Sequence, residues 1–81
     1  AFGQLVEDAI WYDKIVDDIK HINAKVIRVE IEANSKDLNN IIGHKKENIN
    51  KLKDTYAVIT IVKCNNKIKP GKFKINVLET A

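Results

Sequence analysis

A single glycine between two short, apolar-patterned helical segments most constrains how this chain can fold. The stretch reads Ile41-Ile42-Gly43-His44-Lys45-Lys46-Glu47-Asn48-Ile49. Glycine has no Cβ, so another backbone can pass close to Gly43, and φ > 0 is accessible there at little cost. The first amides of the following helix lack partners within that helix, and two lysines stand beside them. The pattern therefore predicts two helices joined by a turn that can seat a phosphate.

Length and composition bound the class of protein. The 81 residues give room for one domain with a modest core, and 44% hydrophobic with 31% charged residues is typical of a soluble globular domain. The single cysteine, Cys64, excludes an internal disulfide and favours a reducing compartment, so we expect a cytoplasmic location. No apolar run approaches the roughly 20 residues that span a bilayer, so we expect no membrane partner. Because the chain neither begins with methionine nor contains one, we expect it to be part of a longer protein.

Charge is distributed unevenly along the chain. Five acids against two lysines give residues 1–24 a net charge of −3, whereas nine lysines against four acids give residues 37–81 a net charge of +5. A clustered positive field attracts polyanions and supplies sequence-independent affinity for phosphates. A solvated lysine-rich surface would have the same composition, so the charge alone leaves both interpretations open.

The spacing of apolar residues predicts the elements that flank the turn. Residues 4–21 read as an amphipathic helix, and residues 27–32 alternate as a half-buried strand with one face in water. Asn34 or Ser35 is expected to cap the next helix, which stops at Gly43. The expected apolar stripe of the leading helix is Leu5, Val6, Ala9, Ile10, Val16 and Ile19, and those of the two short helices are Leu38, Ile41 and Ile42, then Ile49, Leu52 and Tyr56.

Two strands are expected in the last third of the chain. Residues 57–63 are rich in β-branched side chains, and Phe73, Ile75 and Val77 alternate with polar residues. Pro70-Gly71 between them favours a type II turn, with the glycine at φ > 0. Asn65-Asn66 can form another turn, so we expect a hairpin whose register stays open.

The element order and the glycine turn together resemble the KH domain, whose core reads Ile-Gly-x-x-Gly-x-x-Ile. The resemblance covers about residues 26–78 and follows the type I order. It implies an α+β fold with a three-stranded sheet, mixed or antiparallel, packed on helices, in the order α-β-α-α-β-β. Here a helix, within residues 1–24, precedes the core at 25–81, and no helix follows the last strand. A leading helix is similar to those of KH modules appended to larger nucleic-acid enzymes or ATPases.

The resemblance implies a binding site for single-stranded RNA or DNA. In the family the turn lies along the backbone of the strand, and the bases face a groove between the helices and the adjacent strand. Gly43 would admit a phosphate, and His44 and Lys45 would be the variable tip residues. The remaining implied site residues are Ile42 and Ile49 in the groove floor, Ile59 or Ile61 beside them, and Lys51, Lys53 and Lys63 if they face the same side.

Lys46 stands where the family has its second glycine. If this position needs φ > 0, a lysine there costs of order 1 kcal/mol relative to glycine. Its side chain either fills the path of the strand or adds a positive charge beside it. Because of this departure, the resemblance supports a KH-like fold more than it supports nucleic-acid binding.

No pattern of catalytic or metal-binding residues is present, so we expect neither an enzyme nor a cofactor. His21, His44 and Cys64 match no zinc spacing. Gly43 lacks the second glycine, lysine and hydroxyl residue that complete a P-loop. The adjacent Asp17 and Asp18 point in different directions on a helix.

The leading helix suggests a different role. Trp11 and Tyr12 are adjacent, so one can pack on the domain while the other is exposed, and aromatic side chains are favoured anchors in interfaces. The sequence thus predicts an accessory module that binds single-stranded nucleic acid through the Gly43 to Lys46 turn. The alternative is a KH-like domain that no longer binds nucleic acid and serves assembly with other domains or subunits.

Overall fold

The sheet is built around β1 (Val26–Ala33), whose alternating side chains are buried on one face. The computed structural model describes residues 2–81, except for the side chains of residues 2, 4 and 5. β1 pairs in parallel with β2 (Ile59–Cys64) and antiparallel with β3 (Phe73–Thr80), which gives the strand order β2-β1-β3. The predicted α+β class, the element order and the three-stranded sheet are confirmed, and the sheet is mixed.

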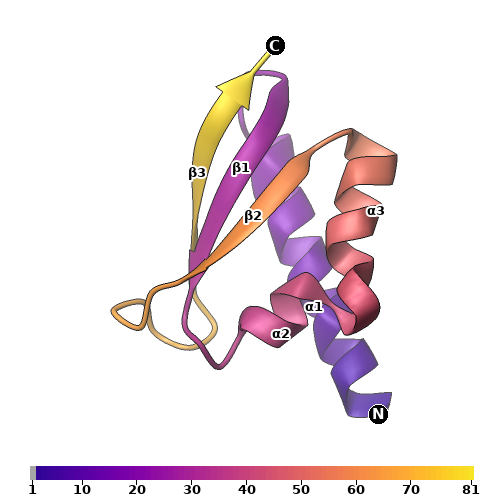
Figure 1. Cartoon of the computed structure of the whole chain (residues 1–81), viewed down its shortest axis with the longest axis vertical. Helices are drawn as coiled ribbons and strands as arrows, with labels where there is room; N and C mark the ends of the chain where they lie inside the picture. The colour runs from indigo at the N-terminus through magenta and orange to yellow at the C-terminus, as the bar shows by residue number, and fades with distance from the viewer. Residues whose placement is uncertain (1) are drawn as a thin grey trace.

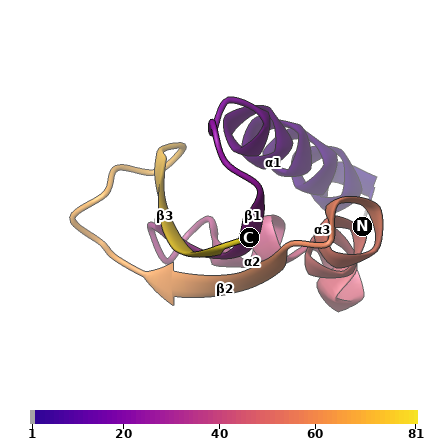
Figure 2. The same cartoon turned by 90° about the horizontal axis from the view of Figure 1, so that it is seen from above.

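The connection from β1 to β2 contains the glycine turn. It runs through α2 (Leu38–Ile42), the 3₁₀ turn η1 (His44–Lys46) and α3 (Glu47–Tyr56). A parallel pair requires such a crossover, because a short hairpin can join only antiparallel strands. Figures 1 and 2 show the helices gathered on the same side of the sheet, with α1 (Phe2–Lys20) behind the strands in Figure 1.

The predicted hairpin between the last two strands is wrong, although both of its predicted turns are present. Ile68 donates its amide to the carbonyl of Asn65 at 3.1 Å, and Lys72 donates to Lys69 at 3.0 Å across the Pro70-Gly71 pair. Gly71 has φ 86°, as a type II turn requires. The chain between the turns carries β3 to the other side of β1, so that β1, the strand with the most buried residues, takes the centre of the sheet and β2 and β3 are its two edges.

The apolar face of α1 is rotated from the predicted stripe. Val6, Ala9 and Ile10 are exposed, whereas Trp11 and Ile15 are buried with Val16. Leu5 lies outside the described side chains. The buried positions of α1 follow the 3.6-residue period of a helix, but one of them, Asp8, is polar. Because Asp8 interrupts the apolar stripe, the stripe was not recognised in the sequence. The residues on this face are Asp8, Trp11, Tyr12, Ile15 and Ile19.

One core joins α1 to the rest of the chain. Ile15, Ile31, Ile41 and Leu52 come from four different elements, and each is completely buried. The partly buried side chains of Ile19, Leu38, Tyr56, Phe73 and Ile75 pack around them. The predicted stripes of α2 and α3 are confirmed, since Ile41 and Leu52 are buried and their predicted neighbours are half-buried.

Two local expectations fail for physical reasons. Neither Asn34 nor Ser35 caps α2, because Asn34 accepts the amide of Lys36 within its own turn and Asp37 is the N-cap. The Asp37 carboxylate makes no capping bond and instead accepts the amide of Gly71 at 2.8 Å. Ile27 is only half-buried because the pairing of β1 with β3 shifts register beside it.

Candidate nucleic-acid interface

Gly43 ends α2 in a conformation that excludes other residues. Its φ is 84° and its ψ is 161°, and its amide donates to the carbonyl of Asn39. A Cβ built on Gly43 would lie 2.8 Å from the backbone nitrogen of Asn48 and 3.0 Å from its side-chain Cγ. The turn is therefore pressed against the start of α3, and this contact requires a glycine.

The two lysines after the turn both adopt the left-handed conformation. Lys45 has φ 54° and Lys46 has φ 61°. Lys46 thus occupies the position expected to need φ > 0, at a cost of about 1–2 kcal/mol for a non-glycine residue. Such strain persists only where the surrounding structure enforces it.

Hydrogen bonds from α1 and α3 enforce this geometry. Asp8 accepts the amide of His44 on its Oδ2 at 3.0 Å. Asn48, 2% exposed, donates its side-chain amide to the backbone carbonyls of Asp8 at 2.9 Å and Asn40 at 3.1 Å. Glu7 accepts from the Asn40 side chain at 2.9 Å. The turn is therefore tied to a helix that precedes it by more than thirty residues.

The amides of the turn are already bonded within the protein, contrary to the expected phosphate seat. Lys46 donates its amide to the carbonyl of Gly43 at 3.0 Å, and Glu47 donates to His44. Together with the bond from His44 to Asp8, these contacts remove three of the donors that an anion could use. The positive charge at this turn therefore comes from its side chains, and most of its amides are not available to an anion.

A groove opens beside the turn. It has a volume of about 220 Å³ and is lined by Ile42, Lys46, Ile49, Thr60 and Val62. Lys46 is exposed at its lip and does not fill it. The hydroxyl of Thr60 is buried and has no hydrogen-bond partner among the described residues. The groove thus combines an apolar floor with a cation, and the Thr60 hydroxyl lies beneath its surface.

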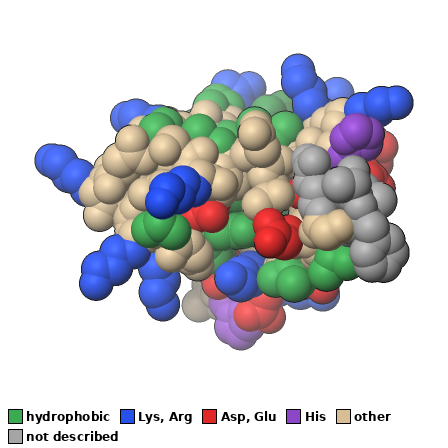
Figure 3. Space-filling view, turned by 90° about the horizontal axis from the view of Figure 1, so that it is seen from below, with side chains coloured by type: hydrophobic (Ala, Val, Ile, Leu, Met, Phe, Trp, Pro, Cys, Tyr) green, Lys and Arg blue, Asp and Glu red, His purple; other side chains and the backbone are tan. Residues whose placement is uncertain are grey.

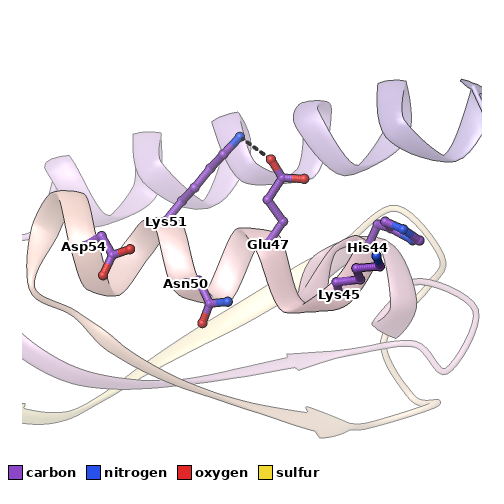
Figure 4. Close-up of a pocket in the computed structure, with 6 residues that line it drawn as sticks. All are labelled: His44, Lys45, Glu47, Asn50, Lys51 and Asp54. Carbon is purple, nitrogen blue, oxygen red and sulfur yellow. Dashed lines mark ion pairs between the residues drawn. The ribbon is translucent and has the colours of Figure 1, made fainter.

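The other side of the turn carries a second, larger pocket of about 450 Å³, lined by polar and charged residues. Figure 4 shows its six residues: His44 and Lys45 lie together at the start of α3, and Glu47 and Lys51 extend toward α1. The Nζ of Lys51 lies 3.2 Å from a carboxylate oxygen of Glu47 and 5.5 Å from the ring centre of Tyr12. This lysine is therefore engaged away from the groove.

The predicted site residues separate onto different surfaces. Ile42, Lys46 and Ile49 line the groove, whereas His44, Lys45 and Lys51 line the opposite surface. The remaining two predicted lysines, Lys53 and Lys63, line neither. Figure 3 shows Lys and Arg side chains scattered over the lower end of the molecule, with acidic and apolar side chains between them. The predicted lysines therefore do not form one continuous basic groove.

The β2 residues that line the groove lie one position away from the predicted ones, Ile59 or Ile61. Thr60 and Val62 line the groove, while Ile59 and Ile61 are 42% and 46% exposed on the opposite face. Val58, 2% exposed, enters the core, and the two-residue period then turns Thr60 and Val62 inward. Since Thr60 is flanked by isoleucines, apolarity alone favoured the wrong face.

Trp11 is a core residue, which corrects its assignment as an interface candidate. It is 6% exposed and makes an edge contact with Phe73, with ring centres 5.7 Å apart. Tyr12 is half-buried against α3, beneath Lys51. A tryptophan on the face that meets the sheet loses most of its surface to its own domain, so Trp11 itself offers little aromatic surface to a partner.

Asp8 and Asn48 are the functional candidates that the sequence did not reveal. Asp8 is 5% exposed, and its second oxygen, Oδ1, is buried without a hydrogen-bond partner among the described residues. An acid at an inward position of the α1 period was the available signal, but only the fold brings it beneath the turn.

These observations define an α+β domain with a three-stranded mixed sheet, one face of which is covered by helices. No family model matches the chain, and neither a curated protein nor a solved structure is significantly similar to it. Among the described residues, no helix is long and apolar enough to cross a membrane, and no group of three or more His, Cys, Asp or Glu side chains could hold a metal ion. The turn and the groove are therefore the features from which a function can be argued.

Proposed function

We propose that this chain is a KH-like accessory module of a longer cytoplasmic protein and that it binds single-stranded RNA or DNA. The observation that carries the proposal is the position of Lys46 at the open lip of the groove. The side chain of Lys46 leaves the groove accessible and places a positive charge where a strand entering it would carry a phosphate.

The groove offers complementary contacts to one nucleotide. Ile42, Ile49 and Val62 provide apolar surface for the face of a base, and Lys46 beside them provides a positive charge for its phosphate. The groove lining contains no aromatic residue on which successive bases could stack. We therefore expect weak binding with little sequence preference, dominated by the phosphate backbone.

The proposal predicts that Lys46→Ala weakens binding and reduces its dependence on salt. A lost phosphate contact lowers the slope of log K against log salt by about 0.7 on a single strand. Lys53→Ala is the matched control, because it removes the same charge from an exposed position of α3 outside the groove. Fluorescence anisotropy with labelled polypyrimidine and mixed-sequence strands, at low and moderate salt, measures both effects.

Two results would contradict the proposal. Equal losses for Lys46→Ala and Lys53→Ala would mean that only the overall charge attracts the strand. No binding by the folded wild type at low salt would exclude a working nucleic-acid site in this module.

The second result would favour the alternative, a KH-like domain that serves assembly. The exposed apolar side chains are the observation on its side. Ile59 and Ile61 on β2, and Val77 and Leu78 on β3, are 41% to 49% exposed on the two edge strands of the sheet. Unpaired edges of this kind can be extended by a strand from another chain.

A further inference from the structure

A buried carboxylate lies directly beneath the basic turn. Asp8 belongs to α1, is 5% exposed, and accepts the amide of His44 at 3.0 Å. Its other oxygen, Oδ1, is buried without a partner among the described residues. Burying an incompletely bonded carboxylate lowers stability, so its presence at this position calls for a physical explanation.

The strain in the turn supplies that explanation. Two consecutive lysines with positive φ would relax to ordinary conformations if nothing held the residue before them. His44 is that residue, and its amide is fixed from the α1 side. Asn48 fixes the other end of the same contact by donating to the backbone carbonyl of Asp8. The two bonds connect α1 to both ends of the turn.

We infer that Asp8 is a positioning residue for the nucleic-acid site, a step that rests on the proposed function. Its carboxylate takes the place that a bound anion would have on the His44 amide and keeps Lys45 and Lys46 left-handed. The lysines then leave the turn toward opposite surfaces, with Lys46 at the lip of the groove. The leading helix is thus an integral part of the site.

Asp8→Asn and Asp8→Ala separate the hydrogen bond from the charge. Asparagine keeps an oxygen for the His44 amide and replaces the other oxygen, Oδ1, with a nitrogen, whereas alanine removes the acceptor. Asp13→Ala is the matched control, because it removes an exposed acid from the same helix with the same change in net charge.

Two readouts test the inference, one of which needs no nucleic acid. Hydrogen exchange of the His44 amide, followed by NMR, should be about tenfold or more faster in Asp8→Ala than in the wild type, because the local hydrogen bond is lost. Binding of a labelled polypyrimidine strand should be about five- to tenfold weaker. Asp8→Asn should restore both values, and Asp13→Ala should lower neither protection nor affinity.

The outcomes distinguish the inference from the function on which it rests. Unchanged His44 protection and unchanged affinity in a folded Asp8→Ala variant would overturn the inference. Faster exchange that Asp8→Asn restores, with no strand bound by any variant, would support the positioning role and refute the proposed function. If Asp8→Ala does not fold, the test is made on the wild type by measuring the NMR scalar coupling between the His44 nitrogen and the Asp8 carboxylate. A measurable coupling across this hydrogen bond supports the inference, and its absence overturns it.

Discussion

At the scale of single residues, Gly43 and Gly71 share a positive φ but differ in their surroundings. A Cβ on Gly43 would meet the backbone of Asn48, whereas a Cβ on Gly71 would have no neighbour within 4 Å. Gly71 is therefore required by its conformation alone, and Gly43 by both its conformation and a close approach.

Replacing each glycine by alanine separates these two requirements. We expect Gly71→Ala to lower the free energy of unfolding by about 1–2 kcal/mol through strain alone. Gly43→Ala should lower it by about 2–4 kcal/mol, because a clash with a fixed backbone atom is added. Urea denaturation followed by circular dichroism measures the difference. Equal losses at the two positions would show that the turn moves away from α3 without cost.

Lys46 shows what the motif can and cannot predict about a single residue. The motif left open whether this position needs φ > 0, and in the structure it has φ > 0 with lysine in place of glycine. The sequence could not show whether the side chain blocks the groove, because this depends on the direction in which the strained backbone points it.

At the scale of the elements, the uncovered face of the sheet holds a cluster of polar side chains across all three strands. Glu32 at the centre accepts from Asn76 of β3 at 2.7 Å and from Asn65, which follows β2, at 3.1 Å. The hydrogen bond from Asn76 lowers the pKa of Glu32 below its usual 4.5, with a further contribution from Asn65. Lys74 and Lys63 on the flanking strands act in the same direction.

The lowered pKa of Glu32 predicts how stability changes in acid. A carboxyl whose pKa is lower in the folded state stabilises it above the unfolded pKa, and this contribution is lost as the pH falls through the folded pKa. We therefore expect Asn76→Ala to reduce the drop in Tm below pH 4.5 relative to the wild type. Asn50→Ala, at an exposed position of α3, is the control. Parallel Tm curves for wild type and Asn76→Ala across the acid range would contradict the assignment.

The strands also show which part of an element the sequence leaves undetermined. β-Branched composition correctly predicted a strand near residues 57–63, because composition reports the preference of the backbone. Which side chains of β2 face the helices depends on where the chain leaves α3. Because Val58 is buried, every second residue after it faces the helices. Thr60 therefore lies in the groove, and its isoleucine neighbours face away from it.

At the scale of the whole molecule, the leading helix and the remaining elements share one core. Trp11, Ile15 and Val16 of α1 belong to the same buried cluster as the central strand. A chain of this size buries a smaller fraction of its surface on folding than a larger domain does, so losing one of the three α-helices among its described residues removes a large part of the driving force for folding.

We therefore predict that residues 25–81 do not fold without residues 1–24. The isolated segment should give a disordered circular dichroism spectrum and poorly dispersed amide resonances, because the sheet face under α1 would be exposed. Adding residues 1–24 as a separate peptide should restore some structure if the interface alone is required. A cooperatively unfolding 25–81 segment would show instead that α1 is an appended element.

Local sequence was enough to predict the helices, the strands, the turns at Gly43 and Pro70-Gly71, and the order in which they follow. Each of these depends on neighbouring residues, through periodicity, backbone preference or the conformational freedom of glycine. Local sequence did not predict that β1 is central, that Trp11 is buried, that the lysines separate and that Asp8 lies beneath the turn. Those outcomes depend on contacts between residues far apart in the chain, which local spacing does not specify.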